Sequence, residues 1–113
     1  MSHDADTPAQ FDEMLKKAPK SLVDFHATWC GPCRAIAPYV VEQCQKEGVN
    51  LIKVDVDKNA TIAGKYSISA MPTFKVIDQS GNVVLEKVGG GQANVNACIA
   101  ACKWKMIPIQ SIK

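Results

Sequence analysis

The sequence contains no long hydrophobic run. Residues 1–20 hold no apolar stretch of the kind that forms the centre of a secretory signal peptide. No window of the chain approaches the ~18 consecutive apolar residues that a membrane-spanning helix needs. We therefore expect neither an export signal nor a membrane span, and a cytoplasmic location as the default.

The chain also lacks a strong excess of charge of either sign. Its formal net charge is +2. Lys103, Lys105 and Lys113 lie in the last eleven residues, which contain no acid, so the rest of the chain sums to about −1. Binding to nucleic acid normally requires a basic patch or stripe. We expect no nucleic-acid partner.

Low-complexity segments, internal repeats and linkers are absent too. The 113 residues, of which 47 % are hydrophobic, are enough for one compact domain with one core. We place that domain at residues 1–102 and a C-terminal tail at residues 103–113. The five cysteines are an odd number, which argues against a fully paired secreted framework and for a compartment where free thiols persist.

Residues 29–33, which read Trp-Cys-Gly-Pro-Cys, are the most informative part of the sequence. They follow an apolar run at residues 21–27 and open a segment that reads as a helix. Two cysteines at C-x-x-C spacing at a helix start, within a strand–helix–strand pattern, indicate dithiol–disulfide exchange.

The predicted position of the first cysteine explains why it would react. A helix start carries unpaired backbone N–H groups and a partial positive charge, and both stabilise a thiolate. We therefore expect Cys30 to be the attacking sulfur. Cys33 returns to nearly the same helix face, so it can attack the resulting mixed disulfide and release the substrate as a thiol.

The neighbours of the two cysteines suit this chemistry. Gly31 has no side chain, so the backbone of a partner can come close to the sulfur. Pro32 fixes φ in the first helical turn, where its missing N–H costs nothing. Trp29 offers a flat apolar wall beside the attacking cysteine.

A zinc site is the alternative interpretation of this motif. A C-x-x-C pair supplies half of the ligands, and two further Cys or His residues would have to complete the site. Cys98 and Cys102, which form a C-x-x-x-C pair at helical spacing, keep this alternative open. Gly-Pro between the first two cysteines and the preceding Trp favour redox use, and we assign no metal ligand.

Hydrophobic periodicity and breaker residues predict the order helix, strand, helix, strand, helix, hairpin, helix. The early crossovers are expected to be parallel and the hairpin antiparallel, which gives an α/β fold with a mixed sheet flanked by helices. The predicted elements are a helix from Thr7 to near Pro19, a strand at 21–27, a helix at 30–47, a strand at 50–56, a short helix within 57–66, strands at 73–77 and 83–88, and a helix from Asn94 to Cys102.

Several residues support these helix boundaries. Thr7, Asn59 and Asn94 are predicted N-caps, because their side chains can accept a hydrogen bond from the first turn. Gly48 ends the second helix. Pro38 is expected to kink that helix, because it removes one backbone donor.

With these elements placed, the sequence resembles the thioredoxin family over roughly residues 7–102. The segments that carry the resemblance are Val23-Asp24-Phe25, residues 27–33, Pro38, residues 54–57, Met71-Pro72-Thr73 and Val88-Gly89. The resemblance implies the thioredoxin fold, with four to five strands flanked by about four helices.

The same resemblance implies a function. The chain would be a monomeric protein-disulfide reductase without a cofactor of its own. Thioredoxin reductase, an NADPH-dependent flavoprotein, would recharge it. Its clients would include peroxiredoxins, ribonucleotide reductase and methionine sulfoxide reductases.

Three residues outside the motif take roles from the resemblance. Asp24 would sit behind Cys33 as its proton acceptor, and burial would raise its pKa. A partly solvated Asp without such a role is the alternative. Lys53 matches a lysine near that Asp and would temper the shift. Pro72 matches a cis proline that faces the active site.

The resemblance also implies a client-docking surface around Cys30. Met71, just before the proline, would offer backbone groups to an extended client peptide. Ordinary core and turn positions are the alternative interpretation of these residues. The predicted surface consists of Trp29, Gly31, Pro32, Met71, Pro72, Val88, Gly89 and Gly90.

The sequence departs from the family pattern at a few places. His26 stands where the family often has Trp, Ser or Tyr, and either tunes the site near neutral pH or is a structural histidine. The segment before Thr7 is short, so the first edge strand is expected to be truncated or absent. Cys44, Cys98 and Cys102 are extra thiols, which we expect to be buried and inert rather than regulatory.

Two other functions remain open at this point. An oxidant or isomerase would use the same motif, but Gly-Pro between the cysteines and the missing signal argue for a reductant. A binding module would use the fold as a subunit of another enzyme and would keep its activity without either thiol.

Overall fold

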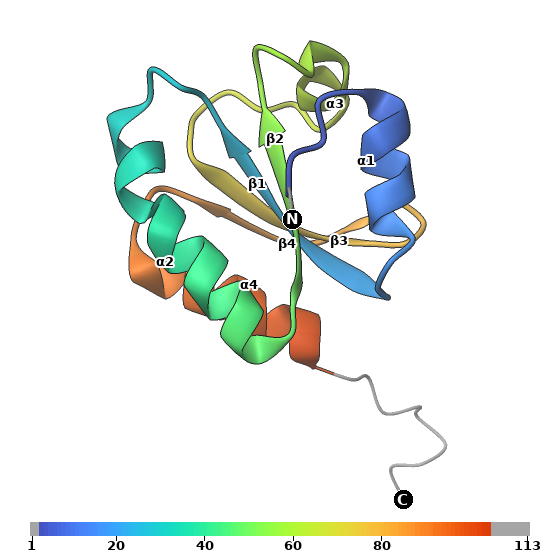
Figure 1. The fold of residues 1–113 in the computed structure, drawn as a ribbon, viewed down its shortest axis with the longest axis vertical. Helices are drawn as coiled ribbons and strands as arrows, with labels where there is room; N and C mark the ends of the chain where they lie inside the picture. Colours follow the sequence, from blue (N-terminus) through green and yellow to red (C-terminus); the bar gives the residue numbers. More distant parts are fainter. Residues whose placement is uncertain (1–2, 105–113) are drawn as a thin grey trace, which may run out of the picture.

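The computed structural model describes residues 3–104, and its elements follow the predicted order (Figure 1). The predicted tail lies outside the described residues from Lys105 onward. The elements are α1 (Pro8–Leu15), β1 (Lys20–His26), α2 (Gly31–Glu47), β2 (Asn50–Asp55), α3 (Ala60–Lys65), β3 (Thr73–Asp78), β4 (Val83–Val88) and α4 (Gln92–Lys103).

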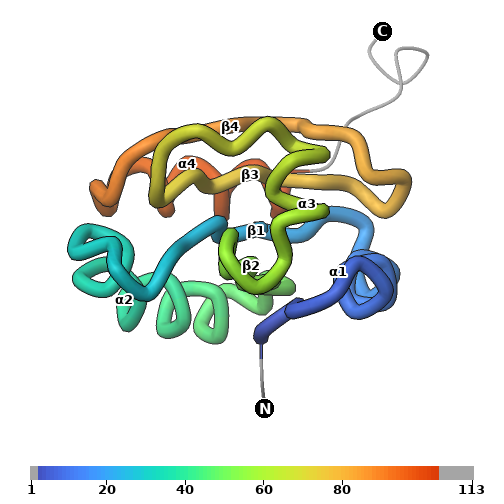
Figure 2. Tube along the Cα trace, turned by 90° about the horizontal axis from the view of Figure 1, so that it is seen from above, coloured from blue at the N-terminus to red at the C-terminus, as the bar shows by residue number. Residues whose placement is uncertain are grey.

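The four strands form one mixed sheet in the order β2-β1-β3-β4. β1 runs parallel to β2, and β3 runs antiparallel to both β1 and β4. Figure 2 looks along the sheet, with α2 and α4 on one face and α1 and α3 on the other. The predicted α/β architecture with a mixed sheet and four helices is therefore confirmed.

Side chains along β1 point alternately to the two faces of the sheet, and this alternation determines which of them lie under α2. Val23 and Phe25 pack in the core with α1 and α3. Leu22 packs in the core with α2 and α4. Since successive side chains of a strand point to opposite faces, Asp24 shares the α2 face with Leu22. A carboxyl group therefore lies in the layer between the sheet and α2.

Within residues 3–104, the segment before α1 contributes a single bridge and no fifth strand. The backbone N–H of Ala5 donates to the Lys53 carbonyl (2.9 Å), and the Lys53 N–H donates to the His3 carbonyl (2.7 Å). The pairing is an isolated parallel bridge beside β2. The predicted truncation of the first edge strand is confirmed.

Most predicted helix ends are confirmed. The Thr7 hydroxyl accepts the Gln10 N–H (3.1 Å), and the Asn59 side chain accepts the Ile62 N–H (3.3 Å). Gly48 ends α2 with φ +68°, in the left-handed region that glycine adopts without strain. The helix continues through Pro38, and the kink expected there stays a prediction.

The predicted cap of the last helix is wrong. α4 begins two residues earlier than expected, at Gln92, with Gly91 as its N-cap. Asn94 lies inside the first turn, and its amide donates to the carbonyls of Val88 and Gly89, both at 3.1 Å. Asn94 therefore ties the end of β4 to α4 instead of capping the helix.

Several other boundaries differ from expectation by one to a few residues. α1 ends at Leu15 rather than near Pro19, and β1 starts and ends one residue earlier than predicted. α4 includes Lys103, which pairs with Glu47 on α2 (2.5 Å). The fold therefore extends one residue past the predicted domain boundary. The ion pair joins the last turn of α4 to α2.

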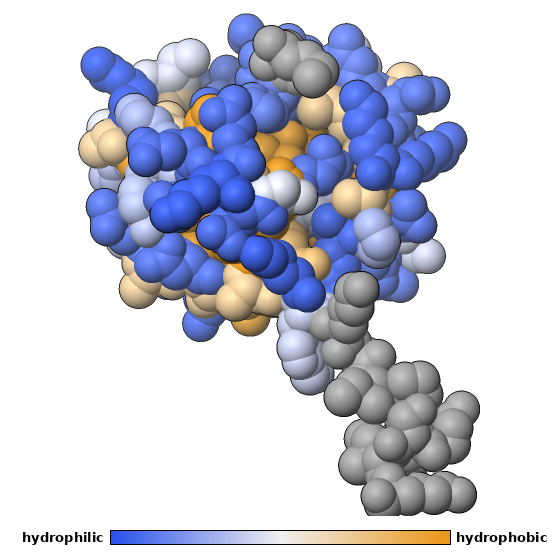
Figure 3. Space-filling model, turned by 60° about the horizontal axis from the view of Figure 1, so that its bottom comes forward, coloured by the Kyte–Doolittle hydropathy of each residue, from blue (hydrophilic) through white to orange (hydrophobic). Residues whose placement is uncertain are grey.

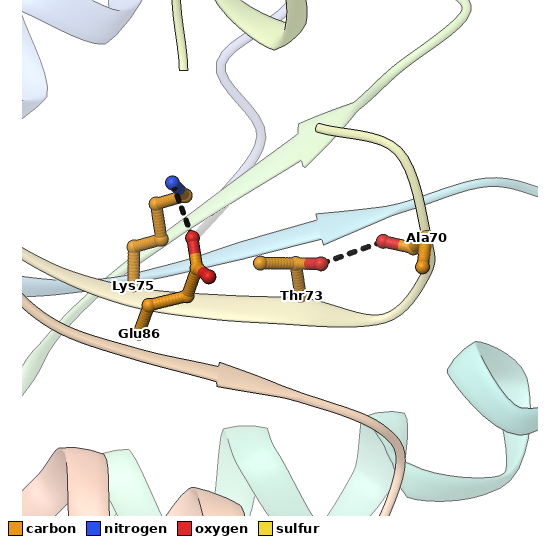
Figure 4. Close-up of polar contacts among 4 residues, drawn as sticks. All are labelled: Ala70, Thr73, Lys75 and Glu86. Carbon is orange, nitrogen blue, oxygen red and sulfur yellow. Dashed lines mark hydrogen bonds and ion pairs between the residues drawn. The ribbon is translucent and has the colours of Figure 1, made fainter. Parts of the chain in front are cut away.

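Lys75 on β3 is a buried cation that the sequence alone did not single out. Its Nζ lies 2.7 Å from the Glu86 carboxylate on β4 (Figure 4). It also lies 5.9 Å from the centre of the Tyr66 ring. In the same figure the Thr73 hydroxyl donates to the Ala70 carbonyl (2.6 Å). The second bond fixes the chain on either side of Met71 and Pro72.

Hydrophilic side chains dominate the face drawn in Figure 3, with hydrophobic ones visible between them. Among residues 3–104, no helix combines the length and apolar character that crossing a membrane requires.

We predict that Asn59→Ala lowers the free energy of unfolding by about 2–3 kcal/mol. The substitution removes the cap of α3 and leaves the Ala5 carbonyl, which Asn59 Nδ2 contacts at 3.0 Å, without its donor. Urea unfolding measures the change. Asn82→Ala in the exposed β3–β4 turn is the control, and an equal loss in both variants would contradict the prediction.

Candidate active site

Cys30 occupies the N-cap of α2. Its backbone is extended (φ −89°, ψ 110°), and its Sγ accepts the Cys33 N–H at 3.2 Å. The Cys30 carbonyl accepts the Arg34 N–H, so the first helical turn is closed on this residue. The sulfur therefore lies where the helix presents its unpaired N–H groups and its positive end.

Cys30 and Cys33 are joined by a disulfide, with their Cα atoms 5.3 Å apart. Both residues are almost fully buried and pack with Ala27 and Met71. The structure therefore describes the oxidised form of this pair.

The opposite wall of the site is the turn that leads into β3. The Met71–Pro72 peptide bond is cis, as the family resemblance implies. The Met71 carbonyl oxygen lies 3.7 Å from Cys30 Sγ, and the Pro72 carbonyl accepts the Gly89 N–H at 2.9 Å. Residues 71–72 therefore lie between the disulfide and the end of β4.

Gly90 brings the segment after β4 against the start of α2. A Cβ on this residue would lie 3.3 Å from the Pro32 carbonyl oxygen and 3.4 Å from Pro32 Cβ. Gly89 has φ +114°, a conformation that side chains rarely adopt. The two glycines allow this close approach, which places residues 88–90 beside the motif.

The structure gathers the predicted docking residues around the disulfide. Trp29 and Val88 are 66 % and 54 % exposed, large fractions for apolar side chains. The Trp29 indole N–H donates to Asp57 Oδ2 (2.9 Å), a contact that orients the ring and that the sequence analysis missed. The role of this surface in client binding stays a prediction.

Asp24 lies behind Cys33, on the sheet face covered by α2. It is 2 % exposed, and its Oδ1 has no hydrogen-bond partner among the described residues. Burial raises the pKa of Asp24 to about 7, while the charge of Lys53, its partner in the β1–β2 register, lowers it. Asp24, Lys53 and Cys33 line one cavity of about 340 Å³. The carboxyl group therefore stays protonated to a higher pH than an exposed aspartic acid would.

His26 lines the same cavity, two residues along β1 from Asp24. Burial and the nearby charge of Lys53 lower the pKa of this half-buried histidine, while Asp55 and Asp4 raise it. Its Nε2 atom is buried without a hydrogen-bond partner among residues 3–104.

The three other cysteines lie away from this site. Cys44 and Cys98 are buried in the core between the sheet, α2 and α4, whereas Cys102 packs against that core and is only partly buried. Burial raises the pKa of Cys44 and Cys102 to about 12 and that of Cys98 to about 11. They therefore resist forming thiolates near neutral pH.

Within the described part of the chain, no group of three or more His, Cys, Asp or Glu side chains is arranged to hold a metal ion. Cys30 and Cys33 are joined to each other, and Cys98 packs in a separate core cluster. The geometry gives no support to the zinc alternative.

A disulfide at a helix N-terminus, facing a cis proline and backed by a buried carboxyl group, defines a thiol–disulfide exchange site. The family model of thioredoxin matches residues 3–101. The chain therefore belongs to the thioredoxin family, whose members are protein-disulfide oxidoreductases.

Individual relatives agree with the family assignment. Thioredoxin-2 of Pyricularia oryzae is 41 % identical over 100 residues, which are 88 % of this chain but only 58 % of that protein. Thioredoxin-1 of Saccharomyces cerevisiae is 36 % identical over 84 % of this chain and 92 % of its own. The structure of Fasciola hepatica thioredoxin superposes with a TM-score of 0.81 at 38 % identity, covering 88 % of this chain and 98 % of that one.

We predict that the free energy of unfolding falls as pH rises, because Asp24 is buried and must give up its proton. Its folded pKa, about 7, lies above the ordinary value of 3.8, so the unfolded chain releases this proton first. Stability from this group is full below pH 3.8 and is lost as pH rises through about 7. The unfolding free energy of Asp24→Asn minus that of the natural protein should grow by about 3–4 kcal/mol over this window.

Urea unfolding of the oxidised protein across this pH range measures the difference. Glu13→Gln, on the exposed side of α1, is the matched control for removing one carboxylate. A constant difference between Asp24→Asn and the natural protein would show that Asp24 does not titrate in this range.

Proposed function

We propose that this chain reduces disulfides in client proteins, with Cys30 as the attacking sulfur and Cys33 as the resolving one. The observation that carries the proposal is the position of Cys30 Sγ, which accepts the Cys33 N–H at the N-cap of α2. In the reduced protein the same N–H and the helix dipole would stabilise a Cys30 thiolate.

Two bond exchanges complete the reaction. The Cys30 thiolate attacks a client disulfide, forms a mixed disulfide and expels the first client sulfur as a thiolate. Cys33 then attacks Cys30 Sγ, which breaks the mixed disulfide, forms the Cys30–Cys33 bond and releases the second client sulfur. Two electrons pass from the dithiol to the client. The resulting product is the disulfide that the structure contains.

Asp24 would accept the proton of Cys33 in the second step. Both side chains line the same cavity, and the raised pKa of Asp24 matches it to proton transfer near neutral pH. Lys53, whose charge opposes the effect of burial, would keep part of the Asp24 population ionised and ready to accept that proton.

Client recognition would use the surface around the disulfide. The Met71 backbone next to Cys30 would pair with an extended client segment, as in strand addition. Gly31 leaves open space beside the sulfur, since nothing lies within 4 Å of a Cβ built there. Trp29 and Val88 would supply apolar contact on either side.

Membership of the thioredoxin family supports a proposal for the wider redox system. An NADPH-dependent thioredoxin reductase would return the Cys30–Cys33 pair to the dithiol. Peroxiredoxins, ribonucleotide reductase and methionine sulfoxide reductases would be clients of the monomer. A reducing compartment such as the cytoplasm fits the three cysteines that remain unpaired in the described chain.

Loss of the attacking sulfur should abolish activity. We predict that Cys30→Ser lowers NADPH- and reductase-coupled reduction of insulin at least ~10²-fold, because the nucleophile is gone. Cys102→Ser, which removes a half-buried thiol elsewhere, should retain activity. An active Cys30→Ser variant would overturn the proposed mechanism.

Loss of the resolving sulfur should trap the intermediate. Cys33→Ser leaves Cys30 able to attack but nothing to break the mixed disulfide, so covalent complexes with clients should accumulate. Non-reducing gel electrophoresis and mass spectrometry of insulin adducts detect them. The double variant with Cys30→Ser is the control, and absence of adducts in the single variant would remove Cys33 from the resolving role.

A further inference from the structure

Two buried polar atoms stand out on the α2 side of the sheet. In the part of the chain that the structure describes, Asp24 Oδ1 and His26 Nε2 are the only buried side-chain nitrogen or oxygen atoms without a hydrogen-bond partner. An unpaired buried polar atom costs about 1–3 kcal/mol. Two such atoms in one place therefore call for a common physical explanation.

Strand geometry brings these two side chains to the same cavity. Residues two apart on a strand point to the same face, with Cα atoms about 7 Å apart. Both residues line the cavity of about 340 Å³ between β1, β2 and α2. A water molecule takes up ~30 Å³ and bridges polar atoms that are about 5–6 Å apart. A single water molecule bound between them in this cavity would satisfy both atoms.

The surroundings of His26 leave its Nε2 free to accept a hydrogen bond. Asp55, its partner in the β1–β2 register, uses Oδ1 to accept the N–H groups of Asp57 (2.9 Å) and Lys58 (3.3 Å). Burial and Lys53 lower the pKa of His26, which favours the neutral imidazole near pH 7. The charged groups around the ring are Asp24 on β1, Lys53 and Asp55 on β2, Lys58 after β2, Asp4 before α1 and Arg34 on α2.

We propose that His26 is a positioning residue for proton transfer: its Nε2 holds a water molecule against Oδ1 of Asp24, and this water carries away the proton that Asp24 takes from Cys33. The inference rests on the proposed reductase function and names the part that this chain's own histidine has in it. In the resolving step the Cys33 proton passes to Asp24 and then through the water to solvent or to the departing client thiolate.

The test follows the two exchange steps separately. The reduced protein is mixed with 5,5′-dithiobis(2-nitrobenzoate), a symmetrical aromatic disulfide whose halves absorb light when released. The first release reports attack by Cys30, and the second reports attack by Cys33. His26→Phe keeps the ring but removes both nitrogens. His26→Gln keeps a hydrogen-bonding group but cannot titrate. Thr28→Ala, at an exposed residue on the rim of the same cavity, is the matched control.

We expect His26→Phe to slow the second release roughly 3- to 10-fold near pH 7, a small part of the ~10²–10⁴-fold that general acid–base catalysis typically supplies. The first release should not change. His26→Gln and Thr28→Ala should stay within about twofold of the natural protein in both steps. In an Asp24→Asn background His26→Phe should have no further effect, because His26 acts through Asp24.

Three results would overturn the proposal: a second release in His26→Phe as fast as in the natural protein, an equal slowing in His26→Gln, or slowing that persists in the Asp24→Asn background. A natural protein that gives the first release but no second release would instead contradict the resolving role of Cys33. If His26→Phe does not fold, a high-resolution crystal structure of the natural protein decides. An ordered water within hydrogen-bond distance of both atoms supports the proposal, and its absence refutes it.

Discussion

The rest of the candidate active site depends on how α2 packs across the sheet. The helix places Cys30 at its N-cap and Cys33 one turn inside, while the same helix covers Asp24 on β1. The same helix thus holds Cys30 Sγ at its positive N-terminal end and shields the Asp24 carboxyl group from water. The sulfur and the carboxyl group to which we assign the two steps of the proposed reaction therefore owe their environments to the same helix.

The second half of the site comes from the hairpin side of the sheet. The cis peptide at Pro72 presents the Met71 carbonyl to the sulfur, and Gly90 packs against Pro32. Asn94 fastens the end of β4 through the carbonyls of Val88 and Gly89. Segments that are 40 to 60 residues apart in sequence are thus held together around the disulfide by backbone contacts.

Local signals in the sequence were sufficient for most of the fold. Thr7, Asn59 and Gly48 act within a single helical turn, so their effects on helix ends can be predicted without tertiary structure. The prediction that Asn94 caps α4 was wrong because its amide donates to a carbonyl at the end of β4, a contact that exists only in the folded chain. The site was predictable where it depended on the motif. The bond from Trp29 to Asp57, the unpaired Nε2 of His26 and the buried Lys75 depend on how strands and turns meet, which no local pattern reveals.

The isolated bridge beside β2 joins the segment before α1 to Lys53, a residue that faces the candidate active site. His3 and Ala5 hold the backbone of Lys53, and the side chain of Lys53 acts electrostatically on both Asp24 and His26. The segment before α1 thus supports the strand position from which Lys53 acts on the carboxyl group. A backbone pairing made before the first helix is therefore linked, through a single lysine, to the environment of a carboxyl group under α2.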